Sequence, residues 1–132
     1  MPYTVVAEIH WEYAHRLIGY NGPCARLHGH SARAEIHCVG ELDKSDIAVD
    51  FGHIKELMQG FVDEKWDHRT ILNVKDPLCA SLVEEEKFEM QFNPTAEIMA
   101  NFLFSLARSH ELPVVKVVIW EGYKNRATFE AD

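Results

Sequence analysis

The sequence predicts an α+β fold, an antiparallel four-stranded sheet with two helices packed on one face. Three observations predict this fold. Two long stretches near the N-terminus alternate between apolar and polar residues, as half-buried strands do. Two later stretches space their apolar residues as amphipathic helices do. An apolar strand and a last strand after a turn close the chain. The predicted elements are strands at 3–15, 28–39, 114–120 and 126–130 and helices at 53–66 and from 93 onward.

The first two strands are expected to form a hairpin. In residues 3–15 the odd positions are mostly apolar or aromatic, and in residues 28–39 the even positions are mostly small or apolar. The loop 16–27 between them is rich in Gly, Asn and Pro, which are typical of loops. It places the end of one strand beside the start of the next. After a polar turn, residues 47–51 are expected to be a short extended segment.

Local signals place the two helices. Apolar side chains from Ile54 to Phe61 recur at helical spacing in the first. The second is expected to begin at Asn93, a favoured N-cap residue, with Pro94 as its first helical residue. Residues 75–92, which include an acidic run, are expected to form a loop that holds a short helix.

Length and composition restrict the class of protein. The 132 residues, 47% of them hydrophobic, suggest one soluble globular domain, 1–132. A formal net charge of −8 disfavours a nucleic-acid partner, and no apolar run is long enough for a membrane span. The first ten residues lack the basic region of a signal peptide, and three irregularly spaced cysteines do not suggest disulfides. We therefore expect a cytoplasmic protein.

Three histidines are expected to converge where the first two strands meet. His28 and His30 are two residues apart in a strand, so both project to one face, and His15 ends the neighbouring strand on the matching face. Three imidazoles without a fourth fixed ligand are typical of a catalytic zinc site with an open position. The alternative is a set of core histidines that bind backbone carbonyls. His10 and His37 point to the opposite face, and this sorting favours the metal site.

Cys24 lies in the loop between these histidines, and three roles are open to it. It could be a fourth zinc ligand, which would make the site structural. It could be a small buried hydrophobe. It could also be a nucleophile or base whose thiol is acidified by zinc and by Arg26.

Other polar residues stand at the ends of predicted elements. Glu121 ends an apolar strand on the inward face, where a carboxylate needs a ligand or a partner such as a Lys or Arg. Asp67 and His68 follow the first helix, where a solvated helix end is the simpler explanation. Glu97 suits the first turn of the second helix as a surface residue, and Asp50 suits a turn or cap.

Six motifs follow one another along the chain. They are Ala14-His15-Arg16-Leu17, Cys24-x-x-x-His28-Gly29-His30, Val49-Asp50-Phe51, Asp67-His68, Asn93-Pro94-Thr95-Ala96-Glu97 and Trp120-Glu121. In this order, over residues 5–128, the set resembles the 6-pyruvoyltetrahydropterin synthase / 6-carboxytetrahydropterin synthase family. Three positions depart from the family pattern: Trp11 stands where Phe is usual, Tyr13 where a small residue is usual, and Gly122 where Thr is usual.

The resemblance implies a fold and a role for each motif. The fold would be the tunnelling fold, in which the sheets of several subunits form a barrel, usually of a hexamer, with active sites at subunit interfaces. Cys24 would accept a proton, the Asp67–His68 pair would complete a triad with it, and Glu121 would anchor the pterin ring. The implied sites are zinc ligands His15, His28 and His30, catalytic residues Cys24, Asp67, His68 and Glu121, and substrate-binding residues Glu121, Thr95 and Glu97.

The resemblance also implies a reaction. The three residues between Cys24 and His28 resemble the carboxy branch, a zinc-dependent lyase of queuosine and 7-deazapurine biosynthesis. It would convert 7,8-dihydroneopterin triphosphate to 6-carboxy-5,6,7,8-tetrahydropterin and release acetaldehyde and triphosphate. The alternatives are the pyruvoyl branch, which eliminates triphosphate, a non-enzymatic zinc- or pterin-binding module on the same fold, and a zinc hydrolase without a pterin anchor.

Overall fold

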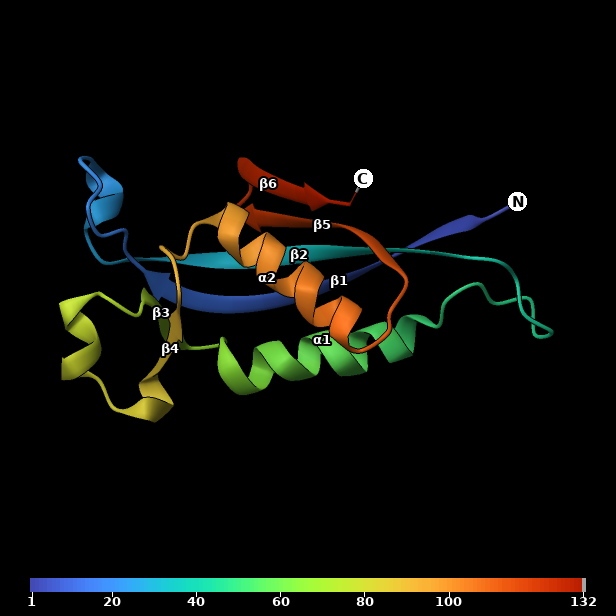
Figure 1. Cartoon of the computed structure of the whole chain (residues 1–132), viewed down its shortest axis with the longest axis horizontal. Helices are drawn as coiled ribbons and strands as arrows, with labels where there is room; N and C mark the ends of the chain where they lie inside the picture. The colour runs from blue at the N-terminus through green and yellow to red at the C-terminus, as the bar shows by residue number, and fades with distance from the viewer. Residues whose placement is uncertain (132) are drawn as a thin grey trace.

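The computed structural model describes residues 1–131, so residue 132 of the predicted domain 1–132 lies outside the described residues. One six-stranded sheet, in the order β4-β3-β1-β2-β5-β6, carries two α-helices (Figure 1). The elements are β1 (Tyr3–His15), β2 (His28–Gly40), α1 (Phe51–Lys65), β3 (Arg69–Asn73), β4 (Lys87–Met90), α2 (Ala96–Ser109), β5 (Val114–Glu121) and β6 (Asn125–Glu130). Short 3₁₀ helices occur at Pro23–Ala25, Pro77–Ser81 and Glu84–Glu86.

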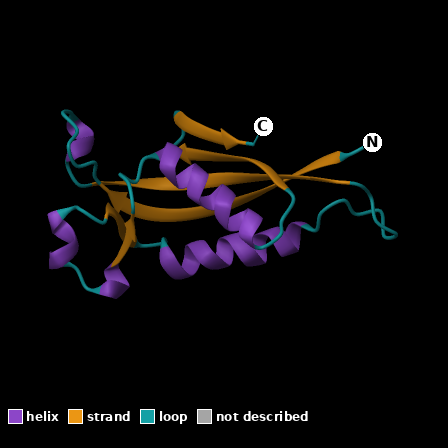
Figure 2. Ribbon diagram, viewed as in Figure 1, coloured by secondary structure: helices purple, strands orange, loops and turns teal. Residues whose placement is uncertain are grey.

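The predicted hairpin is present and forms the centre of the sheet. β1 and β2 are antiparallel along their whole length, from Tyr3 opposite Gly40 to His15 opposite His28. Figure 2 shows their connection as a loop, interrupted by one short helix, beyond the end of the sheet. β5 pairs with β2 and β6 with β5, both antiparallel, as the four predicted strands require.

The prediction of a four-stranded, purely antiparallel sheet was wrong. β3 pairs parallel to β1 at Tyr13–His15, and β4 pairs parallel to β3, so the sheet is mixed and has six strands. The two additional strands have five and four residues. Runs this short give too few alternations for a period of two to be recognised.

Two helix starts also differ from the predictions. Residues 47–51 are not a strand, because Asp50 is the N-cap of α1 and its carboxylate accepts a hydrogen bond from the Gly52 N–H. The N-cap of α2 is Thr95, whose hydroxyl accepts from the Ile98 N–H, and not Asn93. The Asn93 side chain binds the backbone of Ile18 instead, so tertiary contacts override its capping preference.

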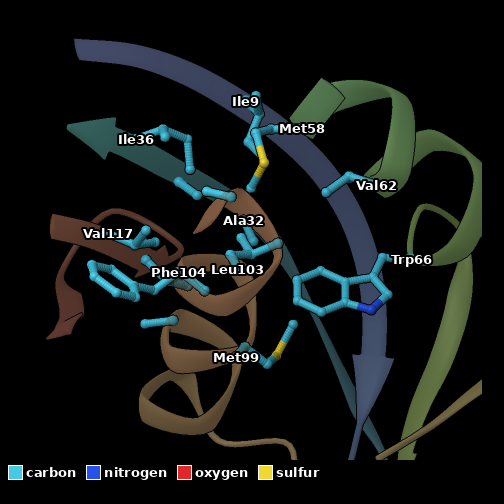
Figure 3. Close-up of a cluster of buried hydrophobic side chains, with 14 of the residues drawn as sticks. Ile9, Ala32, Ile36, Met58, Val62, Trp66, Met99, Leu103, Phe104 and Val117 are labelled. Carbon is cyan, nitrogen blue, oxygen red and sulfur yellow. The ribbon is translucent and has the colours of Figure 1, made fainter. Parts of the chain in front are cut away.

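Both α-helices pack on the same face of the sheet, as predicted. Figure 3 shows side chains of α1 and α2 meeting those of the strands in one layer. Each fully buried aliphatic or aromatic side chain there contributes about 1.5–3 kcal/mol to folding. No helix within residues 1–131 combines the length and hydropathy needed to cross a bilayer. Labelled members of this core are Ile9, Ala32, Ile36, Met58, Val62, Trp66, Met99, Leu103, Phe104 and Val117.

Candidate functional site

The structure brings the three predicted metal ligands together at the end of the β1–β2 hairpin. His15, His28 and His30 each offer one imidazole nitrogen, and these three nitrogens lie within 4.8 Å of one another. His15 is buried, with 3% exposure, and the other two are partly exposed. His10 has 66% of its side chain exposed, and His37 binds Glu35. Strand parity therefore separates the clustered histidines from the other two.

Two backbone carbonyls fix the orientation of the imidazoles. His15 Nδ1 lies 2.7 Å from the Pro94 carbonyl oxygen, and His28 Nδ1 lies 2.6 Å from that of Arg26. A carbonyl oxygen only accepts, so each Nδ1 must donate its hydrogen and each Nε2 keeps a free lone pair. This arrangement is typical of metal-binding histidines and their outer partners.

The donor chemistry of the cluster fits a transition metal. Imidazole nitrogens suit zinc, copper, iron and nickel. Burial lowers the pKa of His15 and of His30, so both favour the neutral form that a metal requires. The cluster could therefore hold a metal ion.

Glu121 lies beside the cluster, at the end of β5. The strand register places it opposite Ala32 of β2, two residues from His30. Its Oε2 accepts a hydrogen bond from the Tyr13 hydroxyl at 3.3 Å and lies 3.9 Å from His15 Nε2. Burial and the nearby carboxylate raise the pKa of Tyr13, so the phenol remains a neutral donor. Within residues 1–131 no Lys or Arg forms an ion pair with Glu121, in contrast to the simpler alternative for this carboxylate.

A cavity of about 360 Å³ adjoins Glu121. Glu97, in the first turn of α2, lines it together with Glu121 and Arg126. Thr95 caps the same helix, directly before the cavity wall. Two of the three predicted substrate-binding residues, Glu97 and Glu121, therefore line one cavity, whose volume is in the range of small-molecule sites, whereas Thr95 is not among its lining residues.

Cys24 is in the 3₁₀ helix of loop 16–27 and is partly exposed as a free thiol. Its carbonyl accepts a hydrogen bond from the Leu17 N–H, which closes the loop. Among the described residues, the mutually close group of ligand atoms contains the three histidines and not the Cys24 thiol. This geometry disfavours the role of fourth ligand in the isolated chain.

Asp67 and His68 form a pair that is held against the edge of β1. One Asp67 oxygen accepts from the Glu12 N–H at 2.8 Å, and the other lies 2.9 Å from His68 Nδ1. Partial burial opposes ionisation, but these two hydrogen bonds prevail and lower the pKa of Asp67. His68 adopts the left-handed backbone conformation, with φ 58°, and has 76% of its side chain exposed. In the described part of the chain, no hydrogen bond or ion pair connects this pair to Cys24 or to the histidines.

Sequence reasoning missed the residues that hold loop 16–27 in place. The Arg16 guanidinium makes two hydrogen bonds to Asp76, whose carboxylate is fully buried. Arg16 thereby lowers the pKa of Asp76. The Asn93 amide binds both the N–H and the carbonyl of Ile18. The sequence shows that Arg16 follows a metal-ligand candidate and that Asn93 precedes a proline. It does not show their partners, which lie 60 and 75 residues away along the chain.

Comparisons with known proteins identify sequences similar to this chain. The chain matches the sequence model described as "6-pyruvoyl tetrahydropterin synthase" over residues 4–132. It is similar to the 6-carboxy-5,6,7,8-tetrahydropterin synthase of Aquifex aeolicus, with 33% identity over 125 residues, covering 83% of this chain and 76% of that protein. The enzyme of the same name from Haemophilus influenzae is 28% identical over 130 residues, covering 90% and 92%.

Solved structures share the fold. An uncharacterized protein from Wolinella succinogenes superposes with a TM-score of 0.87 at 24% identity, covering 100% of this chain and 99% of that one. The 6-pyruvoyl tetrahydropterin synthase of Caenorhabditis elegans gives a TM-score of 0.74 at 22% identity, covering 100% and 97%. At these identities the likeness concerns the arrangement of strands and helices.

Proposed function

Because the chain belongs to the 6-pyruvoyl tetrahydropterin synthase family, we propose that it is a zinc-dependent 6-carboxy-5,6,7,8-tetrahydropterin synthase of queuosine and 7-deazapurine biosynthesis. It would convert 7,8-dihydroneopterin triphosphate and water to 6-carboxy-5,6,7,8-tetrahydropterin, acetaldehyde and triphosphate. The names of the relatives from Aquifex aeolicus and Haemophilus influenzae support this branch. So does the three-residue spacing between Cys24 and His28.

The observation that carries the proposal is the position of Glu121. Its carboxylate lies at the boundary between the histidine cluster and a cavity of about 360 Å³. A pterin presents adjacent N–H donors, which a carboxylate accepts in bidentate fashion. A substrate whose ring binds Glu121 would thus have its side chain close to the histidines. A zinc hydrolase that uses a bound hydroxide would need no pterin anchor, so pterin binding by Glu121 distinguishes the two functions.

The remaining residues receive roles in proton transfer. Cys24 accepts a proton from the substrate side chain, and His68, held by Asp67, returns or relays one. The short contact between Asp67 and His68 Nδ1 supports the orienting role. A zinc ion on His15, His28 and His30 would supply Lewis-acid stabilisation of the negative charge that develops on the substrate's side-chain oxygens. Thr95 and Glu97 contribute to the pterin pocket.

The assembly and location belong to the same proposal. We expect a hexamer whose sheets form a barrel, as the family resemblance implies, and the edge strands β4 and β6 of the described chain are free to pair between subunits. Active sites between subunits would join the Asp67–His68 pair of one subunit to Cys24 of another. The three free cysteines are in keeping with the cytosol.

The direct test is incubation of the zinc-loaded protein with 7,8-dihydroneopterin triphosphate, followed by mass analysis of the products. We expect 6-carboxytetrahydropterin and acetaldehyde, with metal-stripped protein as the control. A 6-pyruvoyl product would assign the chain to the other branch. Unchanged substrate that stays bound would indicate a binding module, and release of phosphate alone would indicate a hydrolase.

A further inference from the structure

Tyr13 lies between the candidate metal cluster and the candidate pterin anchor. It is only 4% exposed, and cross-strand pairing places it opposite His30. Its ring centroid is 5.0 Å from that of His15 and 5.8 Å from that of His30. Its hydroxyl donates to Glu121 Oε2 at 3.3 Å. The phenol is therefore fixed by packing on one side and bonded to the carboxylate on the other.

The same carboxylate oxygen is close to a metal-ligand candidate. Glu121 Oε2 and His15 Nε2 are 3.9 Å apart. Two ligands of one tetrahedral zinc, each about 2.1 Å from the ion, are separated by about 3.4 Å. If Glu121 Oε2 moved about half an ångström closer to His15 Nε2, the two atoms would be separated as two ligands of one zinc are. As a fourth ligand it would close the open position, and it would no longer be free to accept hydrogen bonds from a substrate.

We propose that Tyr13 is a positioning residue that keeps the Glu121 carboxylate off the histidine-bound metal and available to the substrate. The Tyr13 hydroxyl engages Oε2, the oxygen that would otherwise turn toward the metal. The rigid ring, packed against Trp11 and the histidines, limits how far the hydroxyl can follow a moving carboxylate. The part of this inference that concerns substrate binding, the substrate half, rests on the proposed function. The part that concerns the metal, the metal half, does not.

Tyr13→Phe removes the hydroxyl and keeps the ring. We expect Zn²⁺ affinity, measured by competition with a chromophoric chelator, to increase about tenfold, because the released carboxylate becomes a fourth ligand. Affinity for biopterin, a non-reactive pterin, should fall about tenfold in calorimetric titration of the zinc-loaded protein, because the anchor is diverted. If Tyr13 were only structural, Tyr13→Phe would weaken the affinity for both Zn²⁺ and biopterin. A gain in Zn²⁺ affinity together with a loss of biopterin affinity therefore identifies Tyr13 as a positioning residue.

The double variant Tyr13→Phe/Glu121→Gln is the matched control. A neutral amide is a poor zinc ligand, so the gain in zinc affinity should disappear, and Tyr13→Phe should no longer change biopterin binding. Unchanged or weaker zinc binding by Tyr13→Phe, or a gain that persists in the double variant, would overturn the inference.

Glu121→Gln alone gives a second test, at a partly exposed strand end. Zinc affinity should change less than about threefold, because Tyr13 already keeps the carboxylate away from the metal. A loss of more than about tenfold would show that Glu121 is itself a ligand, and the inference would fail. If the wild-type protein binds zinc but no biopterin, the proposed function and the substrate half fall together. The tenfold gain in zinc affinity would still support the metal half.

Discussion

Two backbone carbonyls give the histidine cluster its chemical identity. The Pro94 carbonyl belongs to the segment that leads into α2, and the Arg26 carbonyl belongs to the loop that carries Cys24. Each sets the tautomer of one imidazole, so Nε2 is the unprotonated nitrogen that can bind a metal. Core histidines bonded to carbonyls were the alternative to a metal site. The structure shows such bonds through Nδ1 of His15 and His28, which leave the Nε2 atoms of these two residues free to bind a metal.

The metal content of single variants tests the cluster. Replacing His15, His28 or His30 with Ala should remove about one zinc per subunit, because two remaining imidazoles are a weak site. His10→Ala and His37→Ala are the matched controls and should retain full metal. Elemental analysis of the purified proteins gives the answer. Equal metal loss from all five variants would show that strand parity does not select the ligands.

Strand parity made the histidine cluster predictable from sequence, because a period of two fixes the face of every residue in a long strand. The contact between Tyr13 and Glu121 was not predictable in this way. The two residues are 108 positions apart, and their meeting depends on the β2–β5 register. Sequence could predict that Glu121 needs a partner, but the partner's identity required the fold.

At the scale of elements, loop 16–27 is held by contacts with later parts of the chain. Arg16 is anchored to Asp76 at the start of the 3₁₀ helix Pro77–Ser81, and Ile18 is anchored to Asn93. The segment 75–92 thus has a structural role, because it supplies the acid that fixes the residue after His15.

Asp76→Asn should destabilise the protein by about 3 kcal/mol, because it leaves the Arg16 cation without its buried partner. Urea unfolding at pH 7 measures the loss. Exposed Glu56 on α1 provides the control, since Glu56→Gln should change stability by less than about 0.5 kcal/mol. If Asp76→Asn lost no more stability than Glu56→Gln, the Arg16–Asp76 ion pair would not stabilise the fold.

The same pair predicts a pH dependence. The pKa of Asp76 is lowered in the folded protein, chiefly by its hydrogen bond with Arg16. Its contribution to stability is therefore complete above the unfolded value of about 3.9 and is lost as the pH falls through the lower folded value. The difference between wild type and Asp76→Asn should shrink below about pH 4. A difference that stays constant to pH 2 would contradict this linkage.

The strands with long patterns were predicted, whereas the two shortest strands, β3 and β4, were not. β1 and β2 have thirteen residues each, so their alternation of apolar and polar residues is clear in the sequence. β3 begins with Arg69 and β4 with Lys87, and each is too short to show a face. Their parallel pairing depends on the path of the intervening chain, which no local signal encodes. Asn93 has the propensity of a cap, but its side chain is more fully satisfied by Ile18.

For the whole molecule, the two faces of the sheet differ in kind. The helices cover one face, while the other carries paired charges around Trp120. Arg33 donates to Glu8 and stacks on the Trp120 ring, and the indole N–H donates to Glu35. A polar face with satisfied charges can border water, as antiparallel sheets commonly do. In the proposed hexamer, this face would form the inner wall of the barrel, and the sheet edges that are unpaired in the described residues would lie at the subunit interfaces.

The proposed assembly makes a prediction that one chain alone cannot satisfy. No hydrogen bond or ion pair joins Cys24 to the Asp67–His68 pair in the described residues, and in the proposed assembly they act together across a subunit interface. Cys24→Ala should retain zinc and fold yet lose turnover by about 10²–10⁴-fold, as expected for loss of a general base. His68→Ala should likewise be inactive with its metal in place. Metal loss in Cys24→Ala would instead indicate a structural four-ligand site.

Co-expression of these two inactive variants should restore activity. In a randomly mixed oligomer, about a quarter of the interfaces combine an intact Cys24 with an intact His68 from another subunit, so about a quarter of wild-type turnover should return. Oligomers that carry both variants can be isolated through two different affinity tags. Asp67→Asn with His68→Ala is the control, because these residues bond within one chain and no subunit then offers both. Full inactivity of the Cys24→Ala and His68→Ala mixture would place the whole triad within a single subunit, and recovery in the control would show that Asp67 orients His68 across the interface.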